Sequence, residues 1–360
     1  MKVRGNDVLL PTTLVGAYPR QVFMEGPVFG AGVHDKEFPS YRMRELYRAA
    51  VALTVKDQED VGIDVVTDGA QHYENETDWE LAELFHTLPH HLEGFLPYGE
   101  DVVLGTNTLA VYKPTVVGDV GWVRPIFKPV LEAVRAATDK PLKINVGLGP
   151  TTMALLSTDK HYGGDVKALA FAIADAYNAE FKDLAARGLE QVQFAEPLTQ
   201  FAGLMELESW MVDVLNRCFD GVDMYRVVHL CYGHEQGQPS FDPDWVSADK
   251  VFPFAFDIDC EQFHIEMASH DFRDLEALHG WPRDKDLAVG VIDGKDLRAE
   301  SPERVASWVR RTIDVVPAEQ VGLSTDCALS SVRRIVAKKK LANMVAGAEI
   351  VRAELEGRAG

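Results

Sequence analysis

The feature that most constrains the fold of this chain is a regular alternation between short β-branched runs and longer segments with helical periodicity. The segment 42–60 repeats apolar residues at helical spacing, and it stops at Gly62, directly before the strand-like run 63–67. Strands that alternate with helices in this way are typical of βαβ units, which place parallel strands side by side. A chain of 360 residues can hold a (β/α)8 barrel of ~250 residues together with insertions.

Nine strands are predicted, one more than an eight-stranded barrel needs. They lie at 12–16, 63–67, 114–120, 142–146, 191–194, 226–230, 262–266, 287–293 and 321–324, with helices at about 42–60, 123–137, 165–187, 204–218, 301–313 and 331–355. We assign 101–120 to an inserted hairpin beside the barrel, because its Gly-Thr-Asn turn suits a hairpin and no helix precedes it. No linker is evident, so 1–360 is predicted to be a single α/β domain, a (β/α)8 TIM barrel with long loops at its C-terminal face. A doubly wound open sheet is the alternative, but the Gly-x-Gly-x-x-Gly fingerprint is missing after the first strand.

The charge balance excludes several classes of partner. Against 36 Lys and Arg stand 56 Asp and Glu, a formal charge of -20, which argues against binding to nucleic acid or to an anionic membrane surface. No apolar run reaches the ~18 residues of a membrane span, and the N-terminus lacks the apolar core of a signal peptide. Four scattered cysteines do not make a disulfide framework. We therefore expect a cytoplasmic protein whose cysteines are core residues, metal ligands or nucleophiles.

Two candidate metal ligands stand two residues apart at the end of a predicted strand, in the sequence His229-Leu230-Cys231. Side chains alternate along a strand, so His229 and Cys231 project from the same face. The carboxyl end of a strand is also where barrel enzymes place their active sites. An imidazole and a thiolate at this spacing suit zinc. A core cysteine beside a hydrogen-bonded histidine is the alternative interpretation, which an isolated His-x-Cys motif leaves open.

Two other strand ends carry groups of the same kind. Glu266 ends an apolar strand, where a carboxylate needs a cation or hydrogen-bond donors, because burying an unpaired charge costs several kcal/mol. Cys327 follows the last predicted strand at a turn into a helix. Together with His229 and Cys231 these residues would form a four-ligand site from three strand ends, although spacing alone does not establish that they converge.

Further charged residues follow other strands. Glu196 and Asp68 each stand at the end of a predicted strand. Asp293 stands at the end of a third strand, and Lys295 follows it by two residues. Each acid is equally compatible with a solvated loop position. Cys218 and Cys260 have the surroundings of ordinary thiols and are not assigned a function.

Several short motifs occur together along the chain. They are LPTTLVG at 10–16, VGDV at 117–120, DKPLK at 139–143, LGPTT at 148–152, EP at 196–197, HLCY at 229–232, TDC at 325–327 and NMVA at 343–346. In this order they resemble the C-terminal catalytic barrel of cobalamin-independent methionine synthase and its single-barrel relatives. The resemblance covers nearly the whole chain and implies a zinc ion held by His229, Cys231, Glu266 and Cys327. It also implies that a thiol substrate binds the zinc, loses its proton and attacks an electrophilic carbon, usually the methyl group of a folate.

Three positions depart from the pattern of the methionine synthases. Where that family uses two carboxylates for the amino group of homocysteine and a serine for its carboxylate, this chain has Ala70, Ala195 and Ala17. Each lost hydrogen bond to a charged group weakens binding by about 1.5–3 kcal/mol, so homocysteine is a doubtful acceptor. The epoxyalkane:coenzyme M transferases, which add a sulfonated thiol to an epoxide, are similar zinc barrels that need no ammonium pocket.

The resemblance and its departures together predict a zinc-dependent thiol S-alkyltransferase. Methyl transfer of the methionine synthase type ranks first, epoxide opening by a sulfonated thiol is the alternative, and a zinc-free decarboxylase-like or binding barrel is a third. The partners are a small-molecule thiol and an alkyl donor, such as a methylated folate or a corrinoid, and a homo-oligomer is left open. The catalytic candidates are Lys295, Asp293 and Glu196, and the candidates for substrate contact are Ala17, Arg20, Asp68, Ala70, His72 and Ala195.

Overall fold

A sheet of six parallel strands forms most of the barrel. The computed structural model describes residues 1–3, 6–21, 41–71, 88–89, 91–96, 102–104, 110–199, 202, 205–233 and 248–357. Within them the strand order is β13-β12-β11-β10-β9-β7. The bounds are β7 (Lys143–Leu148), β9 (Gln191–Ala195), β10 (Tyr225–Leu230), β11 (Gln262–Ile265), β12 (Asp286–Ile292) and β13 (Val321–Thr325). All six match predicted strands to within two residues.

Two short segments close this sheet into a ring. Thr12 forms a parallel bridge to Leu323 of β13, and Val66 forms one to Leu142, just before β7. The two segments also join each other, because the backbone N–H groups of Asp64 and Val65 both donate to the carbonyl oxygen of Thr12. The predicted strands at 12–16 and 63–67 thus occupy the first two positions of the barrel but pair over single residues. The predicted (β/α)8 barrel is confirmed.

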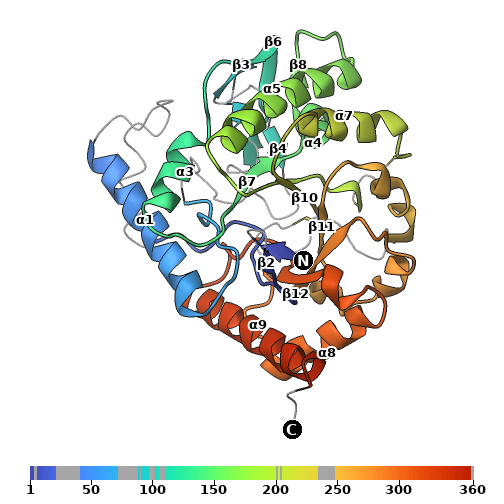
Figure 1. The fold of residues 1–360 in the computed structure, drawn as a ribbon. Coiled ribbons are helices and arrows are strands. Elements are labelled where there is room, and N and C mark those ends of the chain that lie inside the picture. Colours follow the sequence, from blue (N-terminus) through green and yellow to red (C-terminus); the bar gives the residue numbers. More distant parts are fainter. Residues whose placement is uncertain are drawn as a thin grey trace.

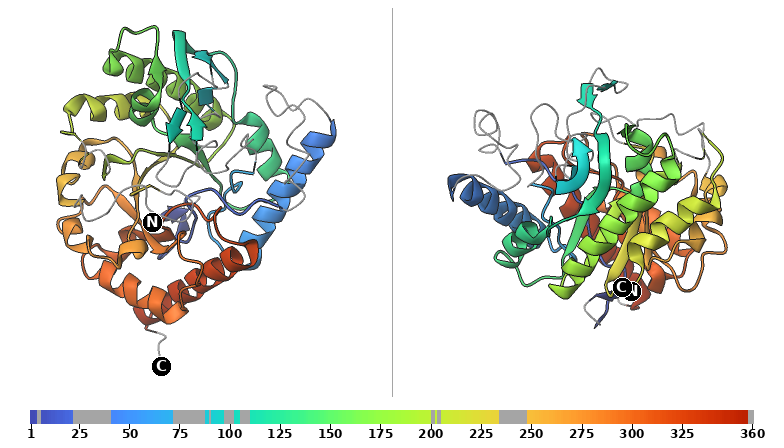
Figure 2. Two further views of the ribbon diagram at one scale, coloured as in Figure 1. Left: turned by 180° about the vertical axis from the view of Figure 1, so that it is seen from behind. Right: turned by 90° about the horizontal axis from the view of Figure 1, so that it is seen from above.

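Helices surround the strands (Figures 1 and 2). Their bounds are α1 (Tyr41–Asp60), α3 (Lys128–Arg135), α4 (Pro150–Leu156), α5 (Val166–Ala186), α7 (Ser209–Phe219), α8 (Pro302–Ile313) and α9 (Arg334–Leu355). Asp165 and Ser301 cap α5 and α8, accepting hydrogen bonds from backbone N–H groups three residues on, at 2.9 Å and 3.2 Å. The prediction placed the start of α3 five residues too early, at 123. The residue before a proline avoids the helical region, and Pro125 lies in that stretch.

Among the described residues between β10 and β12, which begin again at 248, the helical segments are short 3-10 turns. They are η3 (Ala248–Lys250), η4 (Phe254–Asp257), η5 (Ala268–His270) and η6 (Leu275–Leu278), and η7 (Ala318–Gln320) precedes β13. Large apolar side chains in this region are buried, including Phe252, Phe263 and Trp281. Their rings pack edge to face, at centroid distances of 5.6–6.0 Å. An aromatic cluster therefore covers this side of the barrel.

The predicted insertion lies outside the six-stranded sheet, as expected, but it is more than a hairpin. The hairpin itself is β4 (Val102–Leu104) paired with β5 (Ala110–Tyr112). The end of the predicted segment instead belongs to β6 (Thr115–Trp122), which pairs with β3 (Leu92–Leu96) and β8 (Thr158–Asp159) in a separate sheet. The indole N–H of Trp122 donates to Glu180 of α5 at 2.6 Å, which ties this sheet to the barrel.

A two-stranded ribbon of β1 (Lys2–Val3) and β2 (Asn6–Asp7) comes first in the chain.

Five of the barrel strands are buried along almost their whole length, and β10 is buried from Val227 onward, as expected for a parallel sheet covered by helices. The register places Ala195, His229 and His264 side by side on β9, β10 and β11. The carboxyl ends of these strands therefore meet at one end of the barrel. None of the described helices has the length and apolarity needed to cross a membrane.

Candidate metal centre and active site

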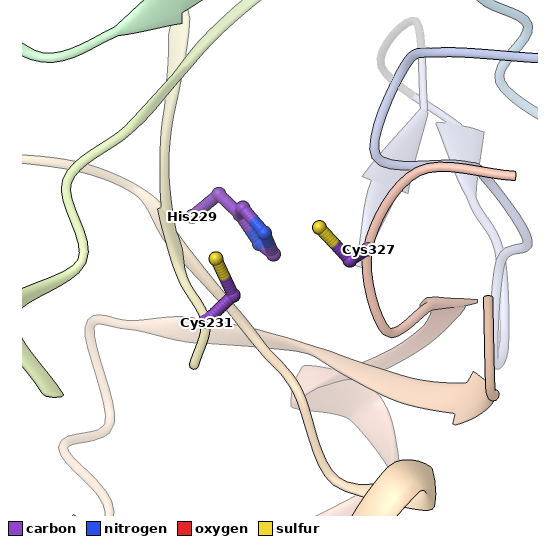
Figure 3. A group of neighbouring side chains, drawn as sticks. All are labelled: His229, Cys231 and Cys327. Carbon is purple, nitrogen blue, oxygen red and sulfur yellow. The ribbon is translucent and has the colours of Figure 1, made fainter. Parts of the chain in front are cut away.

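His229, Cys231 and Cys327 meet at the carboxyl end of the barrel. Each offers one ligand atom, and these three atoms all lie within 4.8 Å of one another. His229 is on β10, Cys231 directly follows that strand, and Cys327 follows β13. Figure 3 shows the three side chains turned toward a common centre. Their exposed fractions are 1%, 7% and 9%, so bulk water has little access to the group.

The imidazole of His229 is the most informative of the three. Neither of its ring nitrogens has a hydrogen-bond partner among the described residues, although both are buried. Buried polar groups in folded proteins are nearly always satisfied, because an unpaired one costs free energy. Two cysteine sulfurs beside an unpartnered imidazole form a donor set that suits zinc. The three residues therefore fit a zinc ion.

Glu266, the fourth predicted ligand, lies beside this group and is held by other partners. Its Oε2 accepts a hydrogen bond from the backbone N–H of Tyr232 at 3.0 Å, and its Oε1 accepts one from the Ser269 hydroxyl at 2.5 Å. Oε1 also pairs with the ammonium of Lys295. Burial alone would raise the pKa of this carboxyl group, but Lys295 and Ser269 outweigh it and lower the pKa to about 2. Glu266 is therefore an anion, and its role as a zinc ligand stays a prediction.

Lys295 reaches the site from the loop after β12. Its side chain is 5% exposed. Burial opposes the charge of its ammonium, yet Glu266, Cys327 and Asp326 together raise its pKa above the ordinary value. Asp293 does not touch the group of ligand atoms; its Oδ1 accepts a hydrogen bond from the backbone N–H of Lys295 at 2.8 Å. Asp293 thus shapes the turn that presents Lys295.

Two residues that the sequence argument missed fix the loops of the site. Asp326 is fully buried and accepts three backbone hydrogen bonds, from Met267 at 3.0 Å, Ala268 at 2.9 Å and Ser269 at 2.6 Å. Lys340 of α9 donates to the carbonyl oxygen of Asp293 at 2.9 Å and forms a buried ion pair with Glu300. The position of Asp326 next to Cys327 was the only sequence signal for either.

A polar layer inside the barrel lies against His229. The ring of His264 packs on it at a centroid distance of 4.6 Å and donates from Nε2 to the carbonyl oxygen of Thr325 at 2.7 Å. Gln193 donates to the carbonyl oxygen of Val15 at 2.8 Å and accepts a hydrogen bond from Lys143 Nζ at 2.7 Å. Burial lowers the pKa of Lys143 to about 7. No role was predicted for these residues, because the strands that carry them are mostly apolar in sequence.

Two of the three alanines predicted to contact substrate lie next to elements that carry the ligand group. Ala195 lies opposite His229 in the register of β9 and β10. The carbonyl oxygen of Ala17 accepts a hydrogen bond from the backbone N–H of Leu329, two residues after Cys327, at 2.9 Å. Ala70 has a left-handed backbone conformation, with φ of 53°.

The remaining predicted residues are three candidates for substrate contact, Arg20, Asp68 and His72, and one catalytic candidate, Glu196. Arg20 and Asp68 are buried, at 8% and 1% exposure, and His72 lies outside the described residues. Glu196 is fully buried and accepts hydrogen bonds from the backbone N–H groups of Thr151 and Thr152, at 3.2 Å and 3.0 Å, so it caps the start of α4. Burial raises its pKa to about 7. These contacts engage Glu196 in holding α4, and its catalytic role stays a prediction.

Comparison with known proteins identifies the family. The model of the family described as "Cobalamin-independent synthase, Catalytic domain" matches residues 10–350. The chain belongs to this family. The resemblance predicted from the sequence motifs is thereby confirmed.

Relatives with two different activities cover almost the full length of the chain. The chain is 29% identical to the 2-hydroxypropyl-CoM lyase of Xanthobacter autotrophicus, over 99% of this chain and 98% of the relative. It is 32% identical to a methionine synthase of Saccharolobus solfataricus, over 97% and 96%. A B12-independent methionine synthase from Shewanella sp. W3-18-1, solved with selenomethionine, superposes with a TM-score of 0.82 at 28% identity, over 97% of this chain and 100% of that one. This member of the family is therefore similar to enzymes of both kinds.

Proposed function

We propose that this protein is a zinc-dependent enzyme that transfers a methyl or other alkyl group to the sulfur of a thiol. The observation that carries the proposal is the buried group of His229, Cys231 and Cys327, whose ligand atoms lie within 4.8 Å of one another. The unpartnered ring nitrogens of His229 support a metal rather than an ordinary core histidine. Relatives named methionine synthase and 2-hydroxypropyl-CoM lyase support a reaction at sulfur.

Four residues of the site would take part in binding the metal ion. His229, Cys231 and Cys327 would hold the zinc ion, with Glu266 as the predicted fourth ligand. Zinc, when bound, lowers the pKa of a coordinated thiol so that its sulfur is a thiolate at neutral pH. The low exposure of His229, Cys231 and Cys327 would keep water away from the thiolate. The surrounding loops would align the thiolate sulfur with the donor carbon. A new S–C bond forms as the bond between that carbon and its leaving group breaks.

Three alanines bear on the identity of the thiol. Ala195 lies next to His229 in the sheet, and neither it nor Ala17 or Ala70 carries a charge for an amino acid substrate. A substrate ammonium would lose its partners there, at about 1.5–3 kcal/mol for each hydrogen bond. We therefore propose an acceptor thiol that lacks the α-amino group of homocysteine.

A second candidate reaction, the addition of a thiol to an epoxide, is favoured by Lys295. Here the S–C bond forms as a C–O bond of the epoxide ring breaks, and the resulting alkoxide must receive a proton. The Lys295 ammonium lies beside Glu266 at the site and is kept charged by its anionic neighbours. It is positioned to donate that proton. Methyl transfer from a methylcorrinoid leaves a cobalt(I) corrinoid and would need no proton, whereas transfer from a methylated folate leaves a ring nitrogen that must also be protonated.

The proposal is tested on the purified protein. Metal analysis should give one zinc per chain, and less than 0.1 zinc per chain would contradict the proposal. Calorimetry with homocysteine, coenzyme M and simple mercaptans, in buffers of different ionisation enthalpy, should show proton release for the true acceptor. Incubation of that thiol with a methylated folate, a methylcorrinoid or an epoxide then separates the two reactions by the mass of the alkylated product.

A further inference from the structure

Lys295 lies on a short loop between β12 and α8, and a buried ion pair lies directly behind this loop. The pair joins Lys340 of α9 to Glu300, whose side chains are 0% and 7% exposed. Nζ of Lys340 lies 3.0 Å from each carboxylate oxygen of Glu300. A charge pair this deep in a protein costs desolvation energy and adds stability only where further hydrogen bonds complete it.

Those further hydrogen bonds all go to the backbone of the loop. Nζ of Lys340 donates to the carbonyl oxygen of Asp293 at 2.9 Å and to that of Arg298 at 2.6 Å. Oε1 of Glu300 accepts a hydrogen bond from the backbone N–H of Asp293 at 3.0 Å. The Lys340/Glu300 pair therefore holds both the beginning and the end of the loop, and neither end can move without leaving a buried polar group unpaired.

The loop between these two anchors presents Lys295 to the site. The backbone N–H of Lys295 donates to Oδ1 of Asp293 at 2.8 Å, and the Ser331 hydroxyl donates to the carbonyl oxygen of Gly294 at 3.3 Å. From this backbone the Lys295 side chain reaches the carboxylate of Glu266. Because Asp293 is only two residues away, its backbone position determines where the Lys295 ammonium lies.

We propose that Lys340 and Glu300 are positioning residues that hold the Lys295 ammonium against Glu266, beside the candidate metal centre. This inference rests on the proposed function, in which Lys295 acts at the reacting atoms. It keeps Glu266 as the predicted fourth zinc ligand, because carboxylates that bind metals are themselves held by hydrogen-bonding partners. A displacement of about 1 Å in a catalytic group can cost about 10²-fold in rate.

The double variant Lys340→Met/Glu300→Gln removes the pair without leaving an unpaired buried charge. The new amide oxygen can still accept the hydrogen bond from the backbone of Asp293, so the principal loss is that of the ammonium donor. The loop should then move away from its present position more readily, and the contact between Lys295 and Glu266 should be less populated.

Lys285→Met is the matched control. Lys285 is also buried, and its ammonium also donates to two carbonyl oxygens, those of Ile258 at 2.8 Å and Cys260 at 3.0 Å. It directly precedes β12, whereas the Lys295 loop follows this strand. Loss of its hydrogen bonds should destabilise the protein without affecting the loop.

Urea unfolding tests whether the pair and Lys295 are coupled. Lys295→Met is introduced into the unaltered protein, into Lys340→Met/Glu300→Gln and into Lys285→Met. In the double variant it should shift the urea midpoint by no more than about half of the shift in the unaltered protein, because the contact with Glu266 is already weakened. In Lys285→Met the shift should keep its full size, since distant sites without shared partners are additive.

Turnover of coenzyme M with epoxypropane provides a second readout. In Lys340→Met/Glu300→Gln, kcat should fall by about 10–100-fold, because the proton donor is misplaced. KM for the thiol should change by less than about threefold, and zinc content should stay the same, because the predicted ligands are untouched. Lys285→Met should keep the kcat of the unaltered protein.

The outcomes distinguish this inference from the proposed function. An equal midpoint shift from Lys295→Met in the unaltered protein and in the double variant would overturn the positioning role. A kcat that falls in Lys295→Met but survives in the double variant would overturn it as well. If the unaltered protein binds no zinc, the proposed function itself fails, and the urea measurements still decide the positioning role.

A milder variant serves if Lys340→Met/Glu300→Gln does not fold. The side-chain amide of Asn343 donates to the carbonyl oxygen of Glu300, so Asn343→Ala loosens the pair while keeping both charges. The midpoint shift from Lys295→Met should again be smaller in this background than in the unaltered protein. An undiminished shift would contradict the proposal.

Discussion

Lys295 and Glu266 form an ion pair in the interior, with side-chain exposures of only 5% and 1%. The two residues are far apart in the sequence and were assigned separate roles, one as a proton donor and one as a zinc ligand. Their contact makes the two roles interdependent, because any movement of Glu266 toward a metal ion changes the electrostatic environment of the Lys295 ammonium.

Replacing Lys295 by methionine tests which reaction the enzyme performs. If the substrate is an epoxide, the alkoxide loses its proton donor, and kcat should fall by about 10²–10⁴-fold. If a methyl group comes from a methylcorrinoid, the leaving group needs no proton, and kcat should change far less. Steady-state rates with both donor types measure this. Equal, large losses with both donors would show that Lys295 is not acting as the acid.

The same substitution should destabilise the fold. Glu266 would remain as a buried carboxylate without its cation, and breaking a buried ion pair in this way costs about 3–5 kcal/mol. Urea unfolding at neutral pH should show this loss for Lys295→Met. The double variant Lys295→Met/Glu266→Gln should recover part of it. A double variant no more stable than Lys295→Met would argue against a direct pair.

Removing a predicted zinc ligand should remove the metal. His229→Ala and Cys327→Ser should each lower zinc affinity by more than about 100-fold, a larger effect than the loss of a supporting hydrogen bond. Plasma mass spectrometry after dialysis against a chelator measures the bound zinc. Cys260→Ala is the matched control, because Cys260 is also buried but is not part of this group. Full zinc occupancy in Cys327→Ser would refute the assignment.

The parts of the barrel that could be predicted are those set by local patterns. Short runs rich in apolar residues marked the six strands of the main sheet. The predicted helix starts at 165 and 301 coincide with the N-cap residues Asp165 and Ser301. The first two strand positions pair over single residues only, which no local pattern distinguishes from a longer strand. The partner of β6 was missed because β3 lies about twenty residues upstream, beyond the reach of a hairpin rule.

The residues of the site also fall into two groups, those that a local sequence pattern predicts and those that long-range packing brings together. The two-residue spacing of His229 and Cys231 follows from strand alternation, whereas the approach of Cys327 required the family resemblance. The contacts of Glu266 depend on how two loops are fixed, one by Asp326 and the other by Lys340. Such loop geometry is decided by long-range packing, so the ion pair between Lys295 and Glu266 could not be derived from spacing.

Acidic side chains should create homocysteine binding if the three alanines exclude it. The double variant Ala195→Asp/Ala70→Glu would offer two carboxylates to the substrate ammonium. Each new charged hydrogen bond should tighten binding by about tenfold or more. Calorimetry would compare homocysteine with mercaptoethanol, which has no amino group and should gain nothing. Tight homocysteine binding by the unaltered protein would contradict our interpretation of these positions.

Lys143 predicts a distinctive pH dependence of stability. Burial lowers its pKa to about 7, against ~10.4 in an unfolded chain. Between these values the unfolded chain binds one more proton than the folded protein, so the free energy of unfolding that this group contributes rises with pH. Below pH ~7 both states are protonated and the full cost of burying the ammonium applies.

The Lys143→Met variant removes this dependence, so its stability relative to the unaltered protein should be greatest at pH ~6 and fall by at most about 5 kcal/mol toward pH ~10. Urea unfolding across this range measures the difference, in which the contributions of groups that do not interact with Lys143 cancel. The lost hydrogen bond to Gln193 adds only a constant offset. Lys182→Met, at an exposed position on α5, should give no such trend. Parallel stability curves for Lys143→Met and the unaltered protein would mean that Lys143 is not a desolvated amine, and that an anion compensates its charge inside the barrel.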